Sequence, residues 1–353
     1  MDKTNAFEIK CIPGGEVSMP PSKSISHRAL ICSALAGKGT SIININPMSD
    51  DVVATLSGLK AMGFQYKSMG KNSIVVDKGI IPFGKSTGDR EDLIFDSKES
   101  GSTLRFMIPL VLLYDVKTRI KGEDRLLQRP LKSFLRALEL KGGRIYQEDH
   151  FIGLKGPLKS GIYEIPGDLS SQFVSGLMMA LPLLNGSSEI HLTTELESRP
   201  YVKMTMEVMS HFGVQVEEIG SKKFGICGNQ SYKPTAYRIE RDFSAAAYFL
   251  VAGALGCDVW CAGLQDDTIQ GDSKITDFIK MCGGNIVRGK NGSVRAIAEE
   301  LRGITADISQ CPDLAPPLAV LLSFCKGKSK IIGAGRLRMK ESDRLKSITK
   351  TLN

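Results

Sequence analysis

The sequence predicts an α/β protein of two domains, each assembled from repeated α/β units. Three observations predict this fold class. The 353 residues exceed what one compact core usually holds. Five segments share one order of polar, helical and β-branched stretches. Their openings, which are 78, 70, 72 and 71 residues apart, lie at Ser22, Ser100, Ser170, Asp242 and Asp313.

Each of these segments follows the same order of elements. A polar cluster begins a helix of small apolar residues, a Gly or Asn turn leads into a β-branched strand, and a charged loop precedes an amphipathic helix that ends in glycine. Short strand patterns such as "NSIVVDKG" and "GVQVEEIG" separate the segments. We therefore expect a βαβαβ-like unit with two helices. The segments run over residues 22–63, 100–143, 170–213, 242–284 and 312–353.

The fifth segment stops at Asn353, inside a helical pattern with no glycine after it. A sixth segment would open near residue 384 at the same spacing. The pattern predicts that about five and a half of six units are present and that the last one is missing.

Composition narrows the class of ligand. A net charge of +8 suits anionic ligands, while an aromatic content of 7% provides few stacking platforms for nucleic acid. No apolar run approaches the ~18 residues of a membrane span, and the N-terminus shows no secretory signal. Eight cysteines without a C-x-x-C pair indicate free, mostly buried thiols and no metal site. We expect a cytoplasmic protein that binds neither nucleic acid nor membranes.

The polar openings are candidate anion sites, because unpaired N–H groups and the helix dipole attract negative charge. In the stretch "PSKSISHRAL", Ser24 is the expected N-cap, and Lys23 and Arg28 flank the first turn. Ser170 and Ser171 repeat the theme. Simple capping is the alternative interpretation, and we expect His27 to be a solvated or capping side chain.

Charged loops form a second kind of candidate site. They contain Arg129, Ser198 and the run "RLRMKESDRLK" with Lys340, Glu341 and Arg344. Arginine forks bind both oxygens of a carboxylate or phosphate, although solvated helix faces would give the same pattern. Asp313 is a carboxylate where the first three segments place hydroxyls, which makes it a candidate general base.

Seven motifs in this order resemble the enolpyruvyl transferase family, in the branch that acts on shikimate 3-phosphate. They are "PSKSISHRAL", "ESGSTLRF", "LLQRP", "SSQF", "ESRPY", "PDLAPPLA" and "LRMKESDRL". The resemblance implies two domains of three units each, one over residues 22–240 and the other over 1–21 with 241–353. The chain would cross between them near Met19–Ser22 and Ile239–Asp242.

The resemblance also implies transfer of the enolpyruvyl group of phosphoenolpyruvate to the 5-hydroxyl of shikimate 3-phosphate, in aromatic amino acid biosynthesis. By this likeness Asp313 is the base and Glu341 the acid–base carboxylate, and Lys23 is a third catalytic residue that also contacts both substrates. The phosphoshikimate site would comprise Lys23, Ser24, Arg28, Ser170, Ser171 and Ser198, and Lys340 would be a further substrate-binding lysine. The phosphoenolpyruvate site, where the family's inhibitor glyphosate competes, would comprise Gly101, Arg129, Gln172 and Arg344.

Three features depart from the family pattern. Glu99 places a carboxylate near a phosphate site, and Arg336 stands where many members have asparagine. The arginine and lysine of the family's last repeat do not occur within these 353 residues. We therefore expect that these 353 residues by themselves catalyse the reaction poorly.

Two alternatives stay open. The sister enzyme that acts on UDP-N-acetylglucosamine uses a loop cysteine, but no cysteine lies between Cys32 and Cys227. A non-catalytic anion- or nucleic-acid-binding repeat protein would use the charged loops as a general basic surface. For the transferase we expect a monomer without cofactor or metal, whose only partners are its two substrates.

Overall fold

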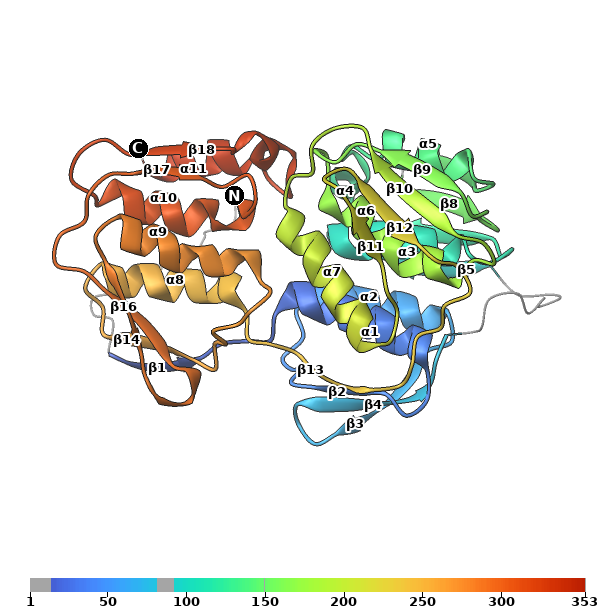
Figure 1. Cartoon of the computed structure of the whole chain (residues 1–353), viewed down its shortest axis with the longest axis horizontal. Coiled ribbons are helices and arrows are strands. Elements are labelled where there is room, and N and C mark those ends of the chain that lie inside the picture. Colours follow the sequence, from blue (N-terminus) through green and yellow to red (C-terminus); the bar gives the residue numbers. More distant parts are fainter. Residues whose placement is uncertain (1–13, 81–91, 149, 353) are drawn as a thin grey trace, which may run out of the picture.

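The computed structural model describes residues 14–80, 92–148 and 150–352, which form two lobes joined by two chain segments (Figure 1). The first lobe surrounds a hydrophobic core drawn from residues between Ile25 and Ile239. The second lobe surrounds a separate core that contains Met19 and residues from Phe243 to Leu337. We propose that these lobes are the two domains that the sequence predicts; residues 1–13 and 353, which the prediction assigns to the second domain, lie outside the described residues.

The two connecting segments lie side by side. Pro21 and Arg241 form an antiparallel bridge. Ser22 N donates to Glu240 O at 2.8 Å, and Asp242 N donates to Pro20 O at 2.9 Å. This pairing supports chain crossings at the two places that the sequence predicts.

Four four-stranded sheets share one pairing pattern: β13-β2-β4-β3, β5-β6-β8-β7 and β11-β12-β10-β9 in the first lobe, and β1-β14-β16-β15 in the second. Each contains one parallel pair and two antiparallel pairs. The unit thus ends in an antiparallel hairpin that the βαβαβ expectation lacked. The second lobe adds the parallel pair β17-β18.

The strands have the following bounds. In the first lobe they are β2 Ser41–Ile43, β3 Gln65–Met69, β4 Ser73–Lys78, β5 Leu93–Asp96, β6 Thr118–Lys121, β7 Arg144–Glu148, β8 Phe151–Lys155, β9 Ile162–Ile165, β10 Ser188–Leu192, β11 Glu217–Ile219, β12 Lys223–Ile226 and β13 Ala236–Arg238. In the second lobe they are β1 Gly15–Ser18, β14 Val259–Ala262, β15 Asn285–Arg288, β16 Val294–Ile297, β17 Thr305–Asp307 and β18 Lys330–Ile332.

The helices are bounded as follows. The first lobe contains α1 Lys23–Ala36, α2 Asp50–Ala61, α3 Gly101–Val111, α4 Asp124–Leu127, α5 Lys132–Glu139, α6 Ser171–Ala180, the 3₁₀ turn η1 Leu181–Leu183 and α7 Arg199–His211. The second lobe contains α8 Phe243–Ala254, α9 Ile275–Met281, α10 Ala315–Ser323 and α11 Arg344–Leu352, with the 3₁₀ turns η2 Gly271–Lys274, η3 Lys290–Gly292, η4 Pro312–Leu314 and η5 Gly335–Met339.

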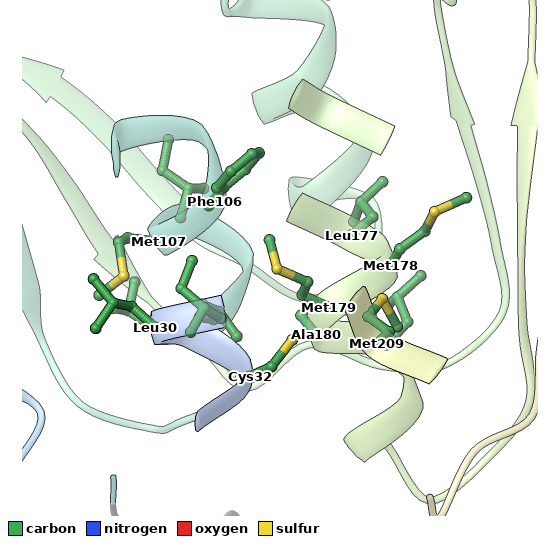
Figure 2. Packing of buried hydrophobic residues seen from close by; sticks show 14 of the residues in the cluster. Leu30, Cys32, Phe106, Met107, Leu177, Met178, Met179, Ala180 and Met209 are labelled. Atoms are coloured by element: carbon green, nitrogen blue, oxygen red, sulfur yellow. The ribbon is translucent and has the colours of Figure 1, made fainter. Parts of the chain in front are cut away.

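Helices α1, α3 and α6 are buried on nearly every side in the first lobe, although α1 carries several polar residues among its buried positions. Figure 2 shows how Leu30 and Cys32 of α1 lie near Phe106 and Met107 of α3 and Met179 of α6. The outer helices α2, α5 and α7 bury one face only. This packing fixes the three inner helices and therefore the directions in which their N-termini point.

Polar residues begin these inner helices, as the sequence predicts. Ser100 Oγ accepts a hydrogen bond from Thr103 N at 3.1 Å, and Ser170 Oγ accepts one from Gln172 N at 3.3 Å. Asp242 caps α8 in the second lobe by accepting from Ala245 N at 2.7 Å. The fifth opening differs, because Asp313 lies inside η4 and not at a helix cap.

Candidate active site between the lobes

A cleft of about 790 Å³ lies between the lobes. Its size suits small-molecule ligands. Every site residue predicted from the sequence lines it: Lys23, Ser24, Arg28, Gly101, Arg129, Ser170, Ser171, Gln172, Ser198, Asp313, Lys340, Glu341 and Arg344. Their individual roles remain proposals.

The first-lobe wall is built from the N-termini of α1, α3 and α6. Lys23 opens α1, and its Nζ pairs with Asp51 Oδ2 at 2.8 Å. Burial lowers the pKa of Lys23, but Asp51, Asp313 and Glu341 outweigh that effect and raise the pKa overall. Three helix ends beside a protonated lysine make this wall attractive to anions.

Arg28 is buried behind this wall, where its hydrogen bonds end on uncharged oxygens. Nε donates to Thr205 Oγ1 at 2.7 Å, and the Nη atoms donate to Ser24 O at 2.7 Å and Tyr201 O at 3.0 Å. Burial lowers the pKa of Arg28 to about 10, so the side chain stays charged at neutral pH. It therefore contributes positive charge that these partners do not neutralise.

Arg105 is a cleft residue that the sequence analysis missed. Its Nη1 donates to Gln172 Oε1 at 3.1 Å, and Gln172 Nε2 in turn donates to Ser102 Oγ at 2.9 Å. Burial, followed by the neighbouring Arg129, lowers the pKa of Arg105 to about 9. The sequence could have indicated this position, because Arg105 lies four residues after Gly101, one helical turn along α3, and therefore on the same face of the helix.

Asp313 and Glu341 face this wall from the second lobe. Arg344 Nη1 donates to Asp313 Oδ1 at 2.7 Å, and Lys340 Nζ lies 3.5 Å from the same oxygen. Burial would raise the pKa of Asp313, but Lys340 and Arg344 hold it below its ordinary value. Asp313 is therefore a carboxylate at neutral pH and able to accept a proton.

Glu341 pairs with arginines from both lobes, with Oε1 3.0 Å from Arg129 Nη2 and Oε2 2.9 Å from Arg344 Nη2. Burial acts to raise its pKa, but Arg129 and Arg344 dominate and lower the pKa to about 2. An anion that competes for these arginines would change the protonation of Glu341.

Ser198 begins α7 with φ of 56°, in the left-handed region that non-glycine residues seldom occupy. Arg336 Nη2 donates to Ser198 Oγ at 2.7 Å and to Ser309 O at 3.2 Å, and Arg336 Nε pairs with Glu197. Arg336 thus joins the lobes at the edge of the cleft. Glu99, the other departure from the family pattern, is exposed.

Two local expectations were wrong. Ser22 and not Ser24 is the N-cap of α1, so Ser24 lies in the first turn. His27 is fully buried, with Nδ1 2.7 Å from Thr55 Oγ1.

Among the described cysteines, Cys32, Cys261, Cys282 and Cys311 are buried free thiols, whereas Cys227 is exposed and Cys257 and Cys325 are half-buried; Cys11 lies outside the described residues.

No group of His, Cys, Asp and Glu side chains within the described residues is arranged to hold a metal ion. None of the helices in the same ranges combines the length and apolarity needed to cross a membrane.

The two-lobed fold is that of a class of solved structures, the enolpyruvyl transferases. The fold matches that of EPSP synthase from Acinetobacter baumannii, with a TM-score of 0.75 and 23% identity over 96% of this chain and 77% of that one. The enolpyruvyl transferase NikO from Streptomyces tendae matches with a TM-score of 0.68 and 18% identity, over 90% and 74% of the two chains.

Sequence relatives narrow this class. The 3-phosphoshikimate 1-carboxyvinyltransferase of Clostridium kluyveri is 42% identical over 343 residues, which are 96% of this chain and 78% of the relative. That of Clostridium perfringens strain SM101 is 40% identical over 341 residues, with 96% and 79% covered. The profile of the EPSP synthase (3-phosphoshikimate 1-carboxyvinyltransferase) family matches residues 13–353, and the chain belongs to this family. The family and fold class predicted from the sequence are confirmed; the number of units stays a prediction.

Proposed function

We propose that the protein transfers the enolpyruvyl group of phosphoenolpyruvate to the 5-hydroxyl of shikimate 3-phosphate and releases phosphate. One observation carries this proposal: a carboxylate, Asp313, faces helix N-termini and buried cations across a single cleft. The cations suit two phosphorylated substrates, and the carboxylate suits removal of a hydroxyl proton. The names of the relatives agree with this chemistry.

The 3-phosphate of shikimate 3-phosphate would bind at the N-terminus of α6. Ser170 and Ser171 begin this helix, and Ser198 begins α7 nearby. Backbone N–H groups and hydroxyls would donate to the phosphate oxygens, while buried Arg28 supplies charge behind them. Lys340 and Lys23 would contact the substrate from the two walls.

Phosphoenolpyruvate would bind beside Gly101, where the backbone comes close to the guanidinium groups of Arg105 and Arg129. Gln172 and Arg344 complete this part of the cleft. The carboxylate and phosphate of phosphoenolpyruvate would bind the arginines that pair with Glu341 in this structure. Added negative charge and weaker pairing would both raise the pKa of Glu341, which favours its protonated form.

The reaction then follows by addition and elimination. Asp313 accepts the proton of the 5-hydroxyl while the hydroxyl oxygen attacks C2 of phosphoenolpyruvate. Protonated Glu341 donates its proton to C3. In the second step Glu341 takes a proton back from C3 as phosphate leaves, and the proton held by Asp313 passes to the released phosphate, which restores the carboxylate. The cations stabilise the charge that builds up on the leaving phosphate.

Calorimetry and a phosphate-release assay on the purified protein test this function. We expect shikimate 3-phosphate to bind, and phosphate release to require both substrates together. UDP-N-acetylglucosamine replaces the acceptor in a parallel assay, and duplex DNA is titrated at two salt concentrations. Release with UDP-N-acetylglucosamine, or salt-dependent DNA binding without binding of shikimate 3-phosphate, would overturn the proposal.

A further inference from the structure

The hydroxyl of Tyr201 lies between two carboxyl groups. It is 3.2 and 3.3 Å from the two oxygens of Asp272, and 3.2 Å from Asp313 Oδ2. Tyr201 belongs to α7 in the first lobe, whereas Asp272 in η2 and Asp313 in η4 belong to the second. Asp272 is only 2% exposed and does not line the cleft, so it can act on substrate only through its neighbours.

A proton count shows what this geometry requires. A phenol carries one proton and can donate it to one carboxylate, but two carboxyl groups contact the same oxygen. Both contacts become hydrogen bonds only if one carboxyl group is itself protonated. Burial and the charge of Asp272 raise the pKa of Tyr201 well above its ordinary value, so the phenol keeps its own proton.

The surroundings identify Asp272 as the group that holds the additional proton. Asp313 lies beside Lys340 and Arg344, which favour its carboxylate. Asp272 instead contacts the uncharged hydroxyls of Tyr201 and Ser244, whose hydrogen bonds lower its pKa less than burial raises it. Burial first, and repulsion by Asp313 second, raise the pKa of Asp272 to about 7. The titratable or charged groups around it are Tyr201 on α7, Asp242 and Tyr248 at α8, Cys311 and Asp313 at η4, and Lys274 on η2 itself.

We propose that Asp272 is a positioning residue that sets the basicity of Asp313 through Tyr201. This inference rests on the proposed role of Asp313 as the general base. When Asp272 is protonated it donates to the phenol oxygen, and the phenol donates to Asp313 and stabilises its carboxylate. When Asp272 loses its proton to solvent, the phenol turns toward Asp272. Asp313 then loses a hydrogen bond, feels a second negative charge and becomes the stronger base.

The first test follows the protons and needs no turnover. Carbon-13 NMR of the aspartate carboxyl groups should show one titration near pH 7 that is absent in Asp272→Asn. Asp313→Asn removes the repelling charge and should move this titration to lower pH, and Tyr201→Phe should move it because the bridge is lost. Asp258→Asn is the control, since Asp258 is an exposed partner of Arg295. No titration near neutral pH, or one unaffected by Asp313→Asn, would overturn the inference.

The second test uses the pH profile of kcat/KM for phosphate release. The wild type should rise through neutral pH, whereas Asp272→Asn, a mimic of the protonated form, should stay on the low-pH plateau. We expect equal rates near pH 5.5 and a gap of about tenfold near pH 8.5, the factor carried by a hydrogen bond of ~1.4 kcal/mol. A uniform loss at all pH values would indicate a structural role and overturn the inference. Absence of turnover together with absence of shikimate 3-phosphate binding would count against the proposed function, and the NMR titration would still decide the role of Asp272.

Discussion

Arg336 donates a hydrogen bond of 2.7 Å from Nη2 to Ser198 Oγ, and this bond joins the second lobe to the first. The side chain of Arg336 is only 14% exposed and also pairs with Glu197. Burial lowers the pKa of Arg336, and Glu197 opposes that effect; the group remains a cation at neutral pH. If Ser198 holds the 3-phosphate, Arg336 adds a charge next to it that an asparagine could not supply.

Arg336→Asn should therefore weaken binding of shikimate 3-phosphate by about 10- to 100-fold, since a charge-assisted hydrogen bond contributes ~1.5–3 kcal/mol. Affinity for shikimate, which lacks the phosphate, should change much less. Arg199→Asn is the matched control, because Arg199 adjoins Ser198 but bonds Glu218 and Ser221 O away from the cleft. Calorimetry with both ligands decides, and an equal loss for shikimate would contradict a phosphate contact.

Local patterns predicted the beginnings of the inner helices, because a cap depends on residues within one turn. Ser100, Ser170 and Asp242 are caps for that reason. Ser24 was misassigned because Ser22, two residues earlier, satisfies the same pattern. His27 was misassigned because α1 is buried on every side, a fact of packing that its polar sequence conceals.

Contacts distant in sequence account for the site residues that were missed. Arg105 lies in the apolar run of α3, and its cleft position depends on how α3 packs against α6. Asp272 belongs to a short turn with no recurring pattern, and it reaches Tyr201 only because the lobes meet there. A single sequence shows which residue types carry charge, but the partner of each charge is set by tertiary packing.

Replacing both Ser170 and Ser171 by alanine should lower the affinity for shikimate 3-phosphate by a few kcal/mol, because each hydroxyl would give a charge-assisted bond worth ~1.5–3 kcal/mol. Ser170 also caps α6, so about 1 kcal/mol of stability should be lost as well. Ser100→Ala removes a comparable cap from a residue that does not line the cleft. Calorimetry measures the loss of affinity for shikimate 3-phosphate, and a melting curve measures the loss of stability separately. An unchanged affinity in the double variant would contradict the assignment.

Gly101→Ala should lower affinity for glyphosate far more than affinity for phosphoenolpyruvate. An added methyl would clash with Arg105 Nη1 and lie 2.8 Å from Arg129 Nη1, so both guanidinium groups must shift and the cleft beside them narrows. A longer ligand should suffer more from the lost space. The inhibition constant of glyphosate and the KM of phosphoenolpyruvate measure the two affinities. If both change by the same factor, Gly101 does not border the part of the cleft that distinguishes them.

Asp272→Asn should make the protein more stable than the wild type above neutral pH, and this advantage should vanish in acid. The folded-state pKa of Asp272 is about 7, above the unfolded value, so the folded state holds an additional proton between these values. The stability that Asp272 contributes is therefore fully present below the unfolded pKa and is lost as the pH rises to about 7, by about 1.4 kcal/mol for each pH unit between the two pKa values. The pKa of Asp313 is lowered from its ordinary acidic value, so this group stays a carboxylate over the range measured and the difference between the two proteins isolates Asp272. Urea unfolding of both proteins from about pH 5 to pH 8.5 measures that difference. A difference that stays constant over this range would show that Asp272 titrates as an ordinary carboxylate.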